Sequence, residues 1–266
     1  IDLQQSENEQ QETEQRSDDI GRGNLTSCFQ LLHLICFADP KYGTPHFKPI
    51  CNFLDDRYTQ CNPPKTFLIT HVASIISMVL PHISKPDQSH KTKLQNKLIY
   101  FMFTATNMNA EATESCAKCL AALCEKANEP SFMTRTLSLI FDKLSLTANA
   151  LAQGRLLVCL GLMVKHFDFD KHEPSQDYLS KVCGKLLQLA ESRIDTNIVR
   201  SLFYVLMKRP TLFRNARISD VIRKALNEKS SESVQTAALL GLSDFLYGEQ
   251  LKMEVQGTTG QNQDAG

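Results

Sequence analysis

The chain has 266 residues, 42% of them hydrophobic, so it can bury a substantial core. Its 11 glycines and 10 prolines are few for that length, which argues against a sandwich or barrel built on many tight turns, and no run of eighteen apolar residues indicates a membrane span. The formal net charge is zero, but both ends are acidic and residues 21–247 carry 27 Lys and Arg against 19 Asp and Glu, which favours a polyanionic partner.

The two ends differ from the rest of the chain. Residues 1–23 are rich in Gln, Glu and Ser, and their first twenty positions hold seven acids and one base. Such a segment buries too little apolar surface to offset the entropy of ordering, so we expect a disordered acidic tail, and without an apolar core after a basic start it is not a signal peptide. Residues 253–266 are similar and are expected to form a second disordered tail. Neither end of the body between them resembles a cap, which suggests a longer array.

Between the tails, residues 24–252 have helical apolar spacing throughout. Cys183, Leu186, Leu187 and Ala190 fall at i, i+3, i+4 and i+7, and no alternating strand pattern occurs. Pairing consecutive helices places the first helix of each pair near residues 25, 65, 110, 150, 196 and 232, a mean spacing of about 41 residues that is typical of HEAT or armadillo repeats. We therefore predict an all-α solenoid of antiparallel helix pairs with HEAT-like repeats.

The nine cysteines mostly lie in apolar segments, and their odd number fits reduced thiols in the cytosol or nucleus. Cys116 and Cys119 form a CxxC, with Cys124 close by. A zinc site usually needs a second such pair, and a thioredoxin-like site needs a βαβ context. Neither is present in the sequence, so we interpret these cysteines as packing residues and expect no metal.

A second cluster closes the helix expected to start near residue 150. It could hold a metal or perform acid–base chemistry, and its members are His166, Asp168, Asp170, His172 and Glu173. A helical zinc site has two His four residues apart, whereas these are six apart, on opposite faces of a helix. We expect the intervening phenylalanines to close the helix end against the core and the two aspartates to cap the turn. No phosphate-binding or nucleophile-elbow motif occurs, so we expect no enzyme, no cofactor and no catalytic residue.

The bases are the more informative group. Arg155 and His166 are eleven residues apart, about three helical turns, and so share a face. Stacked repeats place equivalent helix ends in a row, so Lys165 and His166 should neighbour Lys208 and Arg209. Cations at helix ends also complement the helix dipole, and bases on solvated faces are common. Any single base is weak evidence, but the bases of the body together outnumber its acids. We therefore select as candidate contacts to a polyanion Arg155, Lys165, His166, Lys208, Arg209, Arg214 and Arg217.

Residues 145–170, "SLTANALAQGRLLVCLGLMVKHFDFD", give this pattern a family resemblance. They resemble the large subunit of the cohesin loader, the Nipped-B/adherin family. Three further stretches resemble the same family, namely "THVASIISMVLPHISKP", "EATESCAKCLAALCEKA" and "VQTAALLGLSDFLYGEQLKME". The resemblance covers most of the body as a middle or C-terminal fragment, and neither tail takes part in it.

The resemblance implies a nuclear, chromatin-associated, hook-shaped HEAT-repeat protein without an active site. Such a protein binds DNA and the cohesin ATPase heads and kleisin subunit, stimulates the cohesin ATPase, and promotes loading for sister chromatid cohesion. Its small partner subunit binds a part of the parent protein outside this segment. The candidate bases then become contacts to DNA or cohesin. The alternative is a HEAT scaffold for protein partners only, such as a transport or cytoskeletal adaptor.

Overall fold

The computed structural model describes residues 25–54, 66–84, 86, 88–104, 108–169 and 177–261, with side chains up to residue 250. These residues form helices and connecting loops, and no strand occurs among them. The all-α prediction is confirmed. The acidic tail expected at residues 1–23 lies outside the described residues.

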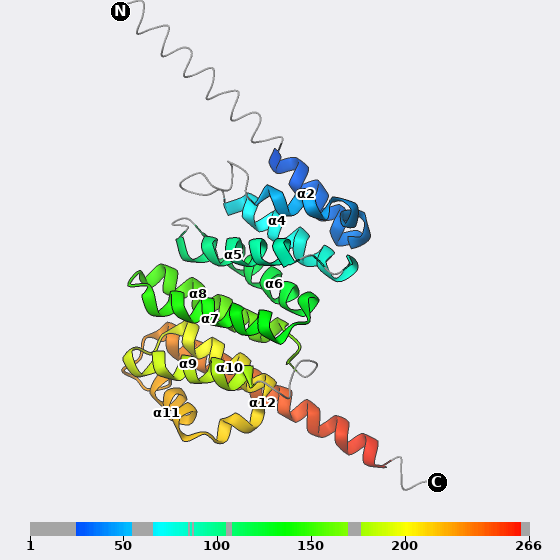
Figure 1. Ribbon diagram of the computed structural model, residues 1–266. Coiled ribbons are helices and arrows are strands. Elements are labelled where there is room, and N and C mark those ends of the chain that lie inside the picture. Colours follow the sequence, from blue (N-terminus) through cyan, green and yellow to red (C-terminus); the bar gives the residue numbers. More distant parts are fainter. Residues whose placement is uncertain are drawn as a thin grey trace, which may run out of the picture.

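The helices follow one another in chain order as a stack (Figure 1). A first helix at residues 25–38 is followed by η1 (Pro40–His46) and α2 (Phe47–Phe53). The remaining elements are α4 (Thr66–Val79), η2 (Leu80–His82), α5 (Gln88–Thr104), α6 (Ala110–Ala127), α7 (Pro130–Leu146), α8 (Ala150–His166), α9 (Tyr178–Ser192), α10 (Thr196–Lys208), η4 (Pro210–Arg214), α11 (Ala216–Ala225) and α12 (Glu232–Gln261).

The stack has two layers. The first layer consists of α4, α6, α8, α10 and α12, each packed side by side on the next, and the second layer consists of α5, α7, α9 and α11. Each second-layer helix follows its first-layer partner in the chain, and the two helices of a pair are antiparallel. This arrangement is the expected α-solenoid, in which each pair buries its apolar face against its neighbours.

The helix starts match the expected positions closely because the sequence marks them chemically. α6, α8 and α10 begin at 110, 150 and 196, after Asn109, Asn149 and Asp195, whose side chains accept backbone N–H groups of the first turn. Asn128 ends α6 in the left-handed region at φ 50°, and Pro130 stands at the start of α7. Local capping and repeat spacing therefore agree.

Hydrogen bonds between neighbouring helices show the repeat register directly. The Ser74 hydroxyl donates to the Ser115 hydroxyl, 41 residues away, at 3.1 Å. The Ser201 hydroxyl donates to the Leu157 carbonyl, 44 residues away, also at 3.1 Å. A register of just over forty residues is therefore built into the first layer.

In the second layer, a half-buried ion pair links α5 to the start of α7. The Lys91 side chain is only 2% exposed, and its amine lies 2.9 Å from a Glu129 carboxylate oxygen. One helical turn along α5, the buried Gln95 amide donates to the Thr136 hydroxyl on α7. Because the Lys91 side chain is buried and its charge is paired with Glu129, Lys91 holds the two helices together and is not a surface base. Removing Glu129 would leave the buried Lys91 charge uncompensated.

The Leu-Gly-Leu motifs of α8 and α12 lie at close helix crossings. A Cβ at Gly161 would collide with the Ser201 hydroxyl on α10, and a Cβ at Gly241 would collide with the Phe203 ring on the same helix. Both glycines thus let α10 approach its two first-layer neighbours.

One boundary differs from the sequence prediction. The solenoid was expected to end near residue 252, but α12 continues to Gln261. No proline interrupts this helix, so the backbone can continue in helical conformation.

Candidate nucleic-acid interface

Three first-layer helices bring lysines together around one imidazole. Lys118 lies on α6, Lys165 precedes His166 at the end of α8, and Lys208 ends α10, and all four side chains are exposed. We call Lys118, Lys165 and Lys208 the lysine cluster. The expectation that the ends of α8 and α10 are neighbours thus agrees with the structure.

The pKa of His166 reports the same arrangement electrostatically. Desolvation lowers this pKa below its ordinary value of 6.5, and the charges of Lys118, Lys165 and Lys208 lower it further, while Glu114 acts in the opposite direction. Each positive neighbour makes a second positive charge on the ring less favourable. The neutral form of the His166 imidazole is therefore favoured at pH 7.

Lys165 and Lys118 each make one contact with a neighbouring side chain. The Lys165 amine lies 5.4 Å from the centre of the Tyr204 ring on α10, a cation–π contact across the two helices. The Lys118 amine lies 2.7 Å from a Glu114 carboxylate oxygen one turn earlier on α6. Hydrogen bonding from Lys118 is the main cause that lowers the pKa of Glu114. Among the described groups that act on His166, Glu114 is the acid and the three lysines are the bases.

Arg155 does not join this face. Its Nε donates to the Met102 carbonyl at 3.1 Å, and burial lowers the pKa of its guanidinium. The guanidinium therefore holds the end of α5 against α8. Arg155 and His166 were expected to share a helix face. The Arg155 side chain instead points toward α5 in the second layer, so the two residues do not belong to one site.

Three other candidate arginines also lie away from the lysine cluster. Arg209 donates to the Asp177 carboxylate at 2.8 Å, at the start of α9. Arg217 pairs with Glu191 across α11 and α9. Arg214 is exposed in η4, which packs on α10 and α11. The sequence-predicted group is therefore divided, and of its seven members only Lys165, His166 and Lys208 lie together.

Lys118 was missed by the sequence analysis because it lies inside the CxxC word, between two buried thiols. A signal was present, since Glu114 and Lys118 form an i, i+4 pair that indicates an exposed helix face. The cysteines themselves are buried, and burial raises the pKa of Cys116 and Cys124 to about 12 and that of Cys119 well above its ordinary value. Such protonated thiols are poor nucleophiles and metal ligands, and no group of three potential metal ligands occurs within the described ranges.

The cluster after α8 is divided by the end of that helix. Phe167 and Phe169 are 1% and 2% exposed, and their rings meet edge to face, so the expected closure against the core is confirmed. The Asp168 amide donates to Glu125 of α6 at 2.9 Å. α8 ends at His166, and the expected placement of His166 and His172 on opposite helix faces stays a prediction. Asp170, His172 and Glu173 lie outside the described residues.

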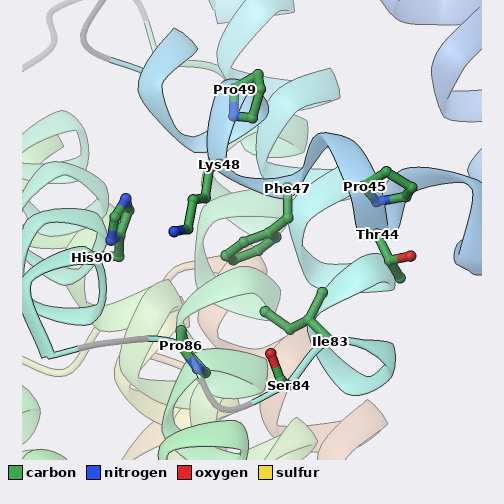
Figure 2. A pocket seen from close by; sticks show the side chains of 9 residues that line it. All are labelled: Thr44, Pro45, Phe47, Lys48, Pro49, Ile83, Ser84, Pro86 and His90. Atoms are coloured by element: carbon green, nitrogen blue, oxygen red, sulfur yellow. The ribbon is translucent and has the colours of Figure 1, made fainter.

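A cavity of about 500 Å³ lies elsewhere, between α2 and the start of α5. Figure 2 shows Phe47 and Ile83 forming its apolar wall, with Lys48 reaching toward His90 at one end. Its described lining includes no carboxylate that could orient the imidazole for acid–base work. The cavity lies among the first helices of the stack and is therefore remote from the lysine cluster.

Comparison with known proteins finds similarity to Nipped-B-like proteins. The Nipped-B-like protein of Homo sapiens is 20% identical over 259 residues, covering 88% of this chain and 9% of that protein. Nipped-B-like protein B of Danio rerio is 22% identical over 254 residues, covering 86% of this chain and 9% of that protein. These similarities support the resemblance of this chain to the Nipped-B-like cohesin loader family, as a fragment of a much longer protein. The chain spans about a tenth of the length of the curated relatives it matches.

No family model and no solved structure matches this chain. Among the described helices, none combines the length and hydrophobicity that crossing a bilayer requires.

Proposed function

We propose that this Nipped-B-like segment contacts duplex DNA through the lysine cluster and so contributes to cohesin loading in the nucleus. The observation that supports this most directly is the convergence of Lys118, Lys165 and Lys208 from three consecutive first-layer helices. Lysines are compact point charges that bind phosphate without reading bases. A sequence-independent contact suits a protein that acts along whole chromosomes.

The wider assembly follows the family. In this proposal the partners are the cohesin ATPase heads, the kleisin subunit and double-stranded DNA, while the small loader subunit binds a part of the parent protein beyond this segment. The segment stimulates the ATPase by positioning DNA and has no catalysis, metal or cofactor of its own. The buried, protonated cysteines and the divided acidic cluster are consistent with that view.

A second candidate is a scaffold for protein partners only. It is favoured by a groove of about 150 Å³ between α10 and α12, whose lining includes Tyr204, Met207 and Leu240. Met207 and Leu240 are 44% and 56% exposed, so an apolar side chain of a partner could be buried there. The two candidates differ in how their binding responds to salt.

The test is duplex DNA binding of the chain across a salt series. Each phosphate neutralised releases counterions, so the logarithm of the association constant should fall by about 0.9 per log unit of salt. Three lysine contacts predict a slope of about three. A chain that binds no DNA even at about 0.05 M salt would leave the protein-only scaffold as the better proposal.

Binding should also strengthen as the pH is lowered. The pKa of His166 lies below 6.5 in the free chain, and a phosphate placed beside the ring would raise it. The complex then binds more protons than the free chain, so affinity rises as pH falls through the interval between the bound and free pKa values. DNA titrations from pH 7.5 to 5.5 test this. His166→Gln should remove the increase, whereas His82→Gln, on an exposed turn, should keep it.

A further inference from the structure

The lysine cluster is an exposed cationic surface, and the same chain carries a segment of opposite charge. Residues 1–20 hold seven acids and one base. We propose that this acidic segment occupies the lysine cluster and competes there with nucleic acid. The competition rests on the proposed DNA contact, while the docking itself does not.

The segment is the best-matched anion in the chain. Several acids of the solenoid already form ion pairs with bases of the solenoid. Examples are Glu129 with Lys91, Asp177 with Arg209 and Asp220 with Lys224. Among the described groups whose charges act on the His166 ring, Glu114 is the acid and the three lysines are the bases. The surface is therefore left with an excess of positive charge that a row of carboxylates can neutralise.

The segment is also long enough to reach. The helix at residues 25–38 packs on α4, with the rings of His33 and His71 5.5 Å apart. Helices in contact lie about 8–10 Å apart, so α10 lies four such steps, roughly 40 Å, from that first helix. An extended segment of twenty residues spans up to about 70 Å. Every lysine of the cluster is within that range.

Recognition of this kind needs charge rather than shape. Glutamate carboxylates accept hydrogen bonds from the three donors of a lysine amine. The intervening Gln and Ser side chains are polar and need no apolar pocket. DNA phosphates would use the same lysine donors. Segment and duplex are therefore mutually exclusive ligands of one surface.

Covalent linkage makes even a weak anion an effective competitor. A tethered ligand acts at an effective concentration on the order of 1 mM. If the free segment binds with a dissociation constant of about 0.1 mM, deleting it tightens DNA binding by about tenfold. The difference shrinks as salt rises, because screening weakens the contact between exposed charges.

The experiment compares DNA binding by the full chain and by a chain that lacks residues 1–22, each also carrying Lys118→Gln, Lys165→Gln and Lys208→Gln. A synthetic peptide of residues 1–22 is titrated against the shortened chain, and a peptide with every Asp and Glu changed to its amide is its control. Circular dichroism checks that each chain keeps its helix content. A charge-matched triple variant, Arg223→Gln, Lys224→Gln and Lys229→Gln on and after α11, controls for net charge.

We expect the shortened chain to bind DNA about tenfold more tightly, the acidic peptide to reverse the gain, and the cluster variant to abolish both effects. Equal DNA binding by both chains, with no peptide binding, overturns the docking proposal and leaves the DNA contact standing. Peptide binding to the lysine cluster without DNA binding by either chain overturns the DNA contact and supports the docking. A gain that persists in the cluster variant overturns the docking, because it then reflects net charge alone.

Discussion

Neutralising the lysine cluster with Lys118→Gln, Lys165→Gln and Lys208→Gln should weaken duplex DNA binding by up to about a hundredfold near 0.1 M salt. An exposed ion pair contributes up to about 1 kcal/mol, and three such losses correspond to about two orders of magnitude in the dissociation constant. The salt slope should fall by about three units, since each lost phosphate contact removes about one. The loss should be the same for unrelated DNA sequences.

The charge-matched variant Arg223→Gln, Lys224→Gln and Lys229→Gln separates this local effect from net charge. These bases lie on α11 and the turn after it, away from the lysine cluster, so this variant should keep most of the wild-type salt slope. Glutamine preserves helix propensity in both variants. Equal losses in the two variants would mean that DNA follows overall charge, and the lysine cluster would lose its role.

The second large effect concerns stability. Gly161→Ala should lower the free energy of unfolding by about 2 kcal/mol, because the new methyl group meets the Ser201 hydroxyl and also lies 3.2 Å from the Tyr204 ring. Ser201 is buried, and its hydroxyl bonds to the Leu157 carbonyl, so it cannot turn away without losing that bond. Urea unfolding followed by circular dichroism measures the change.

Gly184→Ala is the matched control. Gly184 is in the interior of α9, and a methyl group added there would meet nothing within 4 Å, so alanine should stabilise by about 0.5–1 kcal/mol through reduced backbone entropy. Ser201→Gly should restore part of the loss in the Gly161→Ala chain, as expected when two residues share one crowded site. A Gly161→Ala chain as stable as the wild type would show that α8 and α10 have room to separate.

The helices could be read from the sequence because their signals are local. Asn109, Asn149 and Asp195 cap helices at the positions where the apolar stripes begin, and capping depends on residues only two or three positions away. Phe167 and Phe169 could be placed in the core for the same reason, since two aromatic residues close to a helix end have few alternatives to burial. The end of α12 was less accessible, because no breaker marks it.

The site was harder to predict because its geometry depends on distant partners. Arg155 is held by a carbonyl 53 residues earlier, and Arg209 by a carboxylate 32 residues earlier, and no local pattern records either contact. Lys118 was hidden by the cysteines on both sides of it, which belong to the opposite, buried face of the same helix. Repeat register alone connected Lys165 with Lys208, because equivalent helix ends recur at each repeat.

The unequal packing of the two layers has a mechanical consequence. First-layer helices pack extensively on one another, whereas second-layer helices touch their layer neighbours much less. When such a stack bends, the tightly packed layer keeps its length, and the loosely packed layer stretches or closes. The lysine cluster lies on the inextensible side. We therefore expect a change of curvature to leave the distances between the three lysines nearly constant.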